Sequence, residues 1–198
     1  MTRLTVWSDY VCPFAYVGHL RLRRAQKVAP DAVIEWLPFE LHPETPPQGA
    51  PRADLRRVAE AAGAGGRRGV LRELLDEEGV RLRPSSVQFS SRLALQAAEY
   101  ARDAGAFDAM HDRLFAAAFE DGLDLGRADV LGELADEVGL DGRDLVGVVT
   151  AHGYLHRIVD ALEAAMFAGV TGTPTYRCAD NSVLRGVQPV ARLEEALT

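Results

Sequence analysis

The sequence predicts an α/β fold in which one small sheet-containing domain is interrupted by an all-helical insertion. The first part of the chain alternates strand, helix and strand, and the last part supplies a helix, two strands and a closing helix. The stretch between them carries apolar residues repeatedly at helical spacing. We therefore expect a discontinuous domain of residues 1–48 and 151–198, and a helical insertion domain of residues 49–150.

The N-terminal segment is read as a β-α-β unit. Residues 3–8 alternate loosely between apolar and polar and predict a strand. Pro13 stands where a helix would start, and proline is tolerated there because its missing N–H would be unpaired in any case. Helical apolar spacing over residues 14–28 predicts that helix, and residues 33–39 predict a second strand that ends near Pro38.

The middle of the chain is expected to be helical after a proline-rich loop over residues 43–51. The predicted helices cover residues 52–62, 67–78, 91–103, 107–119, 127–138 and 141–149. Ser90 or Ser91 is a candidate N-cap for the third of them, and Gly139 is a candidate terminator for the fifth.

The last part of the chain predicts one long helix over residues 151–168, two short strands over 176–178 and 182–185, and a closing helix. A glycine-rich segment that contains Pro174 precedes the first of these strands. A proline after Gly-Thr and just before a strand suits a cis X-Pro bond, although as a bare tetrapeptide it is more often an ordinary turn. Together the two ends give the strand and helix order of a thioredoxin fold.

Composition narrows the class of protein. The chain has 198 residues, a net charge of −7 and an apolar fraction of 47%. An acidic balance disfavours nucleic acid and anionic membranes as partners, since both select basic patches. The first residues run straight into a strand without an apolar signal region, so we expect a cytoplasmic protein. Two cysteines in a cytoplasmic chain are more often free or catalytic than bridged.

Cys12 is the residue that carries chemistry. It lies between the first strand and the first helix, where unpaired N–H groups and the positive end of the helix dipole favour a thiolate. We therefore expect a lowered pKa for Cys12. A carboxylate at Asp9 would raise that pKa if it pointed inward, but we expect Asp9 to be a solvated loop residue. The alternative is a buried structural cysteine, since free cysteine is among the most buried residue types.

The motif around Cys12 lacks its second half. A dithiol site of this kind reads Cys-x-x-Cys, and here Ala15 stands at the fourth position. Cys178 follows Pro174 by four residues on a predicted strand, which is about 13 Å of extended chain. A disulfide needs Cα atoms within about 7 Å, so we expect Cys178 to be a partly buried strand residue and not the missing partner.

The chain resembles the DsbA-like thioredoxin family, near the FrnE-like branch and the related 2-hydroxychromene-2-carboxylate isomerases. The matching segments are residues 7–18, 36–43, 93–101 and 169–175. The resemblance implies a thioredoxin fold with an inserted all-helical domain, Cys12 as nucleophile and Pro174 as the cis-proline. FrnE-like proteins read Cys-Pro-Trp-Cys where this chain has Cys-Pro-Phe-Ala, and the isomerases carry serine at position 12, so this chain stands between two patterns.

The expected site therefore consists of catalytic Cys12 and substrate-binding Pro13, Phe14, Thr173 and Pro174. We expect no metal, because the pair His152 and His156, although spaced for one helix face, is more often a solvated pair than a ligand set. We expect no tightly bound cofactor; a low-molecular-weight thiol such as glutathione is the candidate co-substrate. The expected partner is a thiol or disulfide substrate, and a homodimer stays open.

Three functions are compatible with these residues. The first is a thiol-disulfide oxidoreductase in monothiol mode, in which Cys12 forms a mixed disulfide and an external thiol resolves it. The second is an isomerase or transferase that uses a small thiol and encloses an apolar substrate under the helical insertion. The third is a thioredoxin-fold binding module that has lost catalysis.

Overall fold

The computed structural model describes residues 2–51, 65–83 and 85–198. The chain divides into two compact units, one of Met1–Leu41 with Asp160–Thr198 and the other of His42–Val159. The predicted helix over residues 52–62 lies outside the described residues. The expected strands and the other expected helices are found, with ends that differ from the predictions by a few residues.

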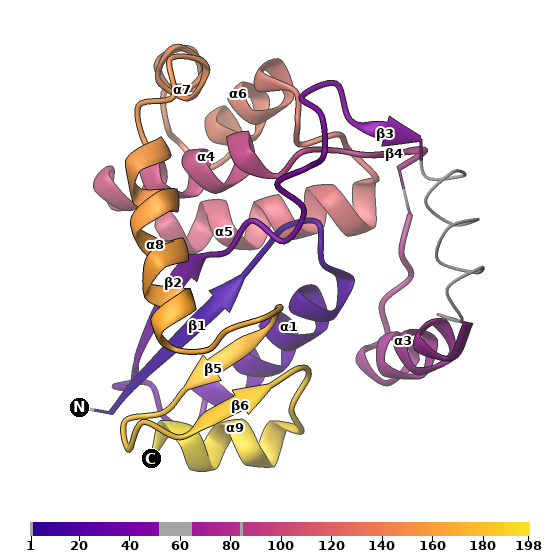
Figure 1. Ribbon diagram of the computed structural model, residues 1–198, viewed down its shortest axis with the longest axis vertical. Coiled ribbons are helices and arrows are strands. Elements are labelled where there is room, and N and C mark those ends of the chain that lie inside the picture. The colour runs from indigo at the N-terminus through magenta and orange to yellow at the C-terminus, as the bar shows by residue number, and fades with distance from the viewer. Residues whose placement is uncertain (1, 52–64, 84) are drawn as a thin grey trace. The chain divides into compact units, whose positions relative to one another are not determined.

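The first unit is built on a mixed four-stranded sheet in the order β2-β1-β5-β6 (Figure 1). Its strands are β1 (Arg3–Ser8), β2 (Val33–Pro38), β5 (Thr175–Arg177) and β6 (Val183–Arg185). β1 pairs in parallel with β2, and β5 lies antiparallel to both β1 and β6. A sheet formed by both ends of the chain and a helical insertion between them is the predicted α/β thioredoxin fold.

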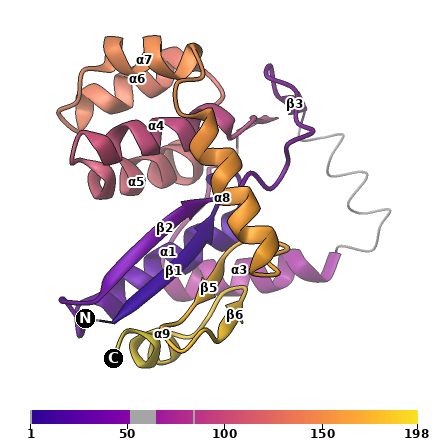
Figure 2. The same ribbon diagram turned by 60° about the vertical axis from the view of Figure 1, so that its left-hand side comes forward.

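Strand β1 is the centre of this unit, and five of its six residues are buried. Helices α1 (Pro13–Gln26) and α9 (Val190–Leu197) pack together behind the sheet (Figure 2). The last turns of α8 (Leu155–Phe167) lie on the other face, where Ala165 and Val170 pack against Trp7. A strand that is covered on both faces reads as a continuous apolar run, which is why the sequence alternates only loosely here.

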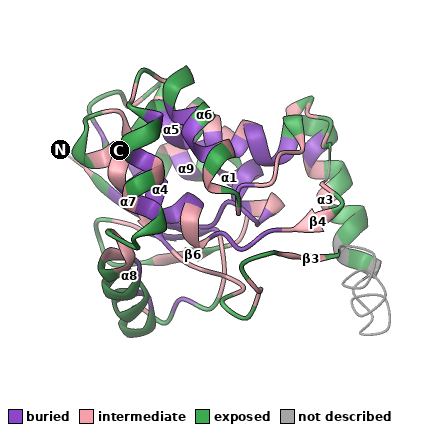
Figure 3. Ribbon diagram, turned by 90° about the horizontal axis from the view of Figure 1, so that it is seen from above, coloured by how far each residue is buried: buried purple, intermediate pink, exposed green. Residues whose placement is uncertain are grey.

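The second unit consists mainly of helices, of which α4 pairs with α5 and α6 pairs with α7 (Figure 2). Its elements are β3 (Ala50–Pro51), α3 (Gly65–Glu78), β4 (Val87–Gln88), α4 (Arg92–Asp103), α5 (Phe107–Ala116), η1 (Ala117–Asp121), α6 (Ala128–Glu137) and α7 (Gly142–Thr150). The core of the four-helix group is formed largely by leucine, alanine and phenylalanine, whereas α3 is mostly exposed (Figure 3).

Two local predictions need correction. The helix expected over residues 151–168 begins only at Leu155, because His152 adopts a positive φ of 57° that breaks the helical path. Ser91 precedes α4 but its side chain makes no capping hydrogen bond. The side chain that does cap a helix is Asp141, which accepts from the Asp144 N–H at the start of α7.

In the parts of the chain that the structure describes, none of the helices combines the length and the apolar character needed to cross a bilayer.

Candidate active site at the start of helix α1

The nucleophile loop joins β1 to α1, and we define it as residues 9–12. It closes as a turn in which the Cys12 N–H donates to the Asp9 carbonyl oxygen at 3.2 Å. Cys12 is the N-cap residue of α1 in an extended conformation, and Pro13 occupies the first helical position. The sequence thus places the sulfur where the first helical N–H groups have no partner within the helix.

The Cys12 sulfur meets a second segment that is distant in sequence. Cys12 is 4% exposed, and its Sγ lies 3.4 Å from the Thr173 carbonyl oxygen. The Thr173–Pro174 peptide bond is cis. Pro13 and Phe14 follow Cys12 and are half-buried. The structure therefore brings Cys12 and Thr173 into contact, and the neighbouring residues Pro13, Phe14 and Pro174 flank that contact.

The expected lowering of the Cys12 pKa is wrong. Burial is the largest influence, and it raises the pKa of the thiol above its ordinary value because an anion loses solvation there. Contacts with Thr173 and with the backbone N–H groups of Ala15 and Phe14 act in the opposite direction and are too weak to reverse it. The N–H donors predicted from the helix start are present, but the sequence did not reveal how completely the sulfur is buried.

The expectation that Asp9 is solvated is also wrong. Asp9 is 1% exposed. Its Oδ2 accepts a hydrogen bond from the Leu41 N–H at 2.7 Å, and its Oδ1 accepts one of 3.4 Å from the Val11 N–H. The Asp9 charge contributes to raising the pKa of Cys12. A carboxylate that ties the nucleophile loop to the segment after β2 is thus part of the site.

Sequence reasoning also missed the packing beneath the sulfur. A Cβ atom at Gly18 would lie 2.5 Å from the Tyr176 hydroxyl and 2.9 Å from Pro174 Cγ. Tyr176 is completely buried, and its hydroxyl has no hydrogen-bond partner among the described residues. Burial raises the pKa of this phenol, and a charge on Cys12 acts in the same direction. A glycine inside a helical pattern was the available signal for this close approach.

The second cysteine does not complete the site. Cys12 and Cys178 are both free, and Cys178 is half-buried just after β5. Ala15, at the position of a resolving cysteine, is 1% exposed. His152 and His156 are exposed. Among the described residues, no three His, Cys, Asp or Glu side chains gather closely enough to hold a metal ion.

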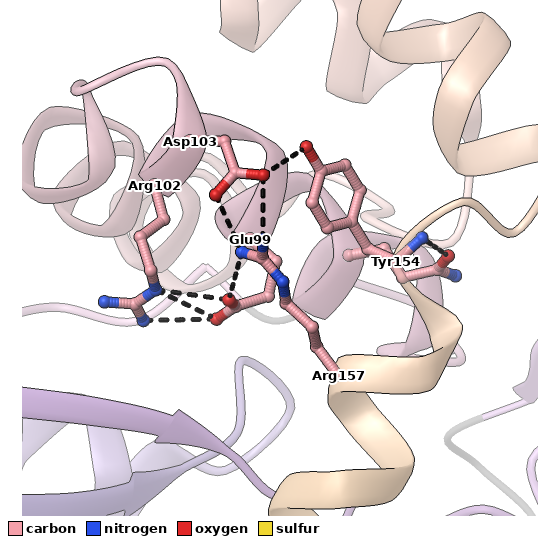
Figure 4. Close-up of polar contacts among 6 residues, drawn as sticks. Glu99, Arg102, Asp103, Tyr154 and Arg157 are labelled. Atoms are coloured by element: carbon pink, nitrogen blue, oxygen red, sulfur yellow. Dashed lines mark hydrogen bonds and ion pairs between the residues drawn. The ribbon is translucent and has the colours of Figure 1, made fainter.

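A cluster of charged residues joins α4 to the start of α8 in the second unit (Figure 4). The Glu99 carboxylate accepts three hydrogen bonds of 3.1–3.3 Å from Arg102 and a longer one of 3.4 Å from Arg157. Asp103 accepts from both terminal nitrogens of Arg157 and, at 2.9 Å, from the Tyr154 hydroxyl. We call these five residues the α4–α8 charge network. Its carboxylates and guanidinium groups are paired with one another, as expected of a structural network.

A β-α-β unit, a closing hairpin and helix, and a cysteine at the start of the first helix together define a thioredoxin-fold protein. The chain belongs to the DSBA-like thioredoxin domain family, whose model matches residues 3–198.

The chain is 29% identical to the uncharacterized protein YwbO of Bacillus subtilis, over 98% of this chain and 95% of that protein. A probable DsbA oxidoreductase from Streptomyces coelicolor has a similar structure, with a TM-score of 0.85, 26% identity, and coverage of 100% of this chain and 89% of that one. A 2-hydroxychromene-2-carboxylate isomerase shares the fold at a TM-score of 0.78 and 18% identity, with 98% and 93% covered. The cytosolic disulfide reductase DsbM from Pseudomonas aeruginosa with GSH does so at 0.72 and 22%, with 98% of each chain covered.

Proposed function

We propose that the protein is a thiol-disulfide oxidoreductase that works in monothiol mode through Cys12. The observation that carries this proposal is the Cys12 sulfur at a helix start, 3.4 Å from the Thr173 carbonyl, with Ala15 in the place of a resolving thiol. Such a site can form one covalent bond with a substrate sulfur and has no thiol of its own at position 15 to break it.

The proposed reaction has two exchange steps. In the first, Cys12 sulfur attacks the glutathione-side sulfur of a mixed disulfide, the substrate leaves as a thiolate, and the Cys12 proton passes to that thiolate. In the second, an external thiolate attacks the same sulfur, Cys12 departs as a thiolate and recovers a proton, and a small-molecule disulfide is released. Electrons balance, because each step breaks one S–S bond and forms another.

The raised pKa of Cys12 favours a particular direction of exchange. A strong oxidant keeps its cysteine as a stabilised thiolate, which makes the reduced form favourable and the cysteine a good leaving group. Burial does the opposite here, because it destabilises the thiolate. The proposed activity is therefore removal of small thiols from substrates, in preference to donation of disulfides.

In the proposed complex, the substrate lies along Pro13, Phe14, Thr173 and Pro174. Pro13 and Phe14 are half-buried, so each keeps part of its surface accessible beside the sulfur. The proposed external thiol is a small one of the glutathione class, and the proposed location is the cytoplasm. Both features are extended from the cytosolic Pseudomonas aeruginosa DsbM, which was solved with GSH.

The proposal is tested with a glutathionylated peptide and reduced glutathione, in wild type, Cys12→Ser and Cys178→Ser. We expect wild type and Cys178→Ser to release the peptide at equal rates, and Cys12→Ser to fall to the rate without protein. Equal activity of Cys12→Ser and wild type would contradict the monothiol mechanism. Ala15→Cys is the complementary variant, and we expect it to bind the small thiol more briefly because a neighbouring thiol can displace it.

A second candidate is a small-thiol-dependent isomerase or transferase. It is favoured by one observation: Cys12, held as a neutral thiol, donates a hydrogen bond, as a serine hydroxyl would. Such a donor could orient the sulfur of a bound small thiol without forming a bond to it. Cys12→Ser separates the two functions, because serine preserves the donor and abolishes exchange. If wild type catalysed no thiol-dependent reaction, the remaining candidate would be a thioredoxin-fold binding module without catalysis.

A further inference from the structure

The segment after β2 and the nucleophile loop are linked by one buried side chain. Asp9 is 1% exposed and lies three residues before Cys12. Its two carboxylate oxygens accept from backbone N–H groups on different segments, Val11 in the loop and Leu41 after β2. Hydrogen bonds from neutral donors to a buried carboxylate favour its charged form.

Burying an aspartate carboxylate costs free energy unless its oxygens are hydrogen-bonded. The burial of Asp9 is therefore unusual for a residue that only closes a turn. An asparagine could accept at one oxygen only, and its NH₂ group would face an N–H. The arrangement therefore specifies a carboxylate. It also holds the carboxylate in the turn that the Cys12 N–H closes by donating to the Asp9 carbonyl oxygen at 3.2 Å, next to a sulfur that is itself buried.

We propose that Asp9 is a positioning residue for Cys12: its buried carboxylate fixes the nucleophile loop to the Leu41 segment and places a negative charge beside the sulfur. Burial is the larger influence on the Cys12 thiol, and the Asp9 charge adds to it by disfavouring the thiolate. A chain with no resolving cysteine at position 15 gains from this, because the neutral thiol is the form least prone to oxidation and to unproductive exchange.

Other charged and titratable groups near Cys12 do not replace this role. Tyr176 reaches toward the site from β5, and burial raises the pKa of its phenol, so the phenol stays neutral near pH 7. The Arg21 guanidinium on α1 acts to lower the pKa of Tyr176 and donates to the Gln188 carbonyl oxygen at 3.3 Å. Among the described residues, the charge of Asp9 acts against the Cys12 thiolate.

The benefit assigned to Asp9 rests on the proposed function, in which Cys12 takes part in thiol exchange. Its test measures the alkylation of Cys12 and does not depend on exchange activity. The rate of Cys12 alkylation by iodoacetamide is measured from pH 6 to pH 10 in a Cys178→Ser background. We expect Asp9→Asn to move the midpoint of the rate profile to lower pH. At pH 7 the rate should rise by about three- to tenfold, because removing a nearby like charge favours the thiolate. Asp31→Asn, which removes an exposed charge from the same unit, should leave the profile unchanged.

A purely structural role would give a different pattern. In that case Asp9→Asn would lower the melting temperature and leave the midpoint of Cys12 alkylation where it is in the parent, which would overturn the proposal. Asp9→Glu serves as a second variant in case the asparagine variant does not fold. It retains the charge, so we expect a midpoint no lower than that of the parent. Absence of exchange activity in wild type would refute the proposed function and leave this inference intact.

Discussion

The surroundings of Cys12 and the α4–α8 charge network both contain buried polar atoms beside a helix. These atoms are hydrogen-bonded in the network, whereas some of them lack a partner near Cys12. In the network, Glu99 is 5% exposed and its carboxylate is held by two guanidinium groups (Figure 4). Near Cys12, the Tyr176 hydroxyl is buried without a hydrogen-bond partner among the described residues. Paired groups stabilise one arrangement, whereas unpaired groups around a nucleophile leave the site able to take a new partner.

The largest expected effect is a loss of stability, without a loss of exchange activity, when the α4–α8 charge network is disrupted. Glu99→Ala leaves two arginines without their shared carboxylate, and breaking a buried pair costs up to about 3–5 kcal/mol. Both arginine side chains are one-third exposed, so solvent reduces the expected loss to about 2–3 kcal/mol. Urea unfolding measures the loss. The rate of glutathione exchange per folded molecule should match wild type, and a selective loss of exchange would contradict a purely structural network.

The next effect concerns the close packing beneath Cys12. In an exposed helix, Gly→Ala stabilises by about 1 kcal/mol. At Gly18 the added methyl meets buried atoms at 2.5 and 2.9 Å, and such overpacking costs about 1–3 kcal/mol. We expect overpacking to prevail, so that Gly18→Ala lowers the free energy of unfolding in urea and slows exchange. Gly147→Ala is the matched control, because a Cβ there meets nothing within 4 Å; stabilisation at Gly18 would contradict the packing described.

A smaller effect follows from the pKa of Cys12. Because the pKa of this thiol is raised in the folded protein, the folded state retains its proton at pH values where the unfolded chain has lost it. Stability from this group is complete below the unfolded pKa and falls as the pH rises through the folded one. Between pH 8 and pH 10, wild type should therefore lose more stability than Cys12→Ser. Parallel curves for the two proteins would show that the folded thiol is not perturbed.

The smallest effect is expected at a surface pair. Arg127 and Asp129 are ion-paired, but both side chains are more than 60% exposed. Exposed pairs contribute little because water and salt screen them. Arg127→Ala should therefore leave the melting temperature within the error of the measurement. A clear loss of stability would mean that exposure is a poor guide to which charge clusters matter in this protein.

The parts of the fold that were predicted are those fixed by local pattern. The apolar run of residues 3–8, Pro13 at a helix start and the glycine-rich approach to Pro174 each identify an element from neighbouring residues alone. The local apolar pattern did not predict the positive φ of His152 or the π-helical turn of η1. For that reason the predicted helix ends near them were wrong or incomplete.

The candidate site also combines features that the local sequence pattern predicts with features that it does not. The position of Cys12 at the start of a helix could be read from the sequence, because strand and helix patterns meet there. The burial of Cys12 and Asp9 depends on Thr173 and Leu41, which are distant in sequence, so the directions of their electrostatic effects could not be read. The sequence located the candidate nucleophile, and the structure was needed to find that its sulfur is buried.

The proposed monothiol mechanism requires Cys12 to take up one small thiol covalently and to need a second thiol for its release. Intact-mass spectrometry of the folded Cys178→Ser protein after incubation with oxidised glutathione measures that adduct. We predict one glutathione per chain on Cys12, stable to dilution and removed by reduced glutathione. Absence of an adduct on the folded protein, with an adduct on the same protein in urea, would contradict the claim.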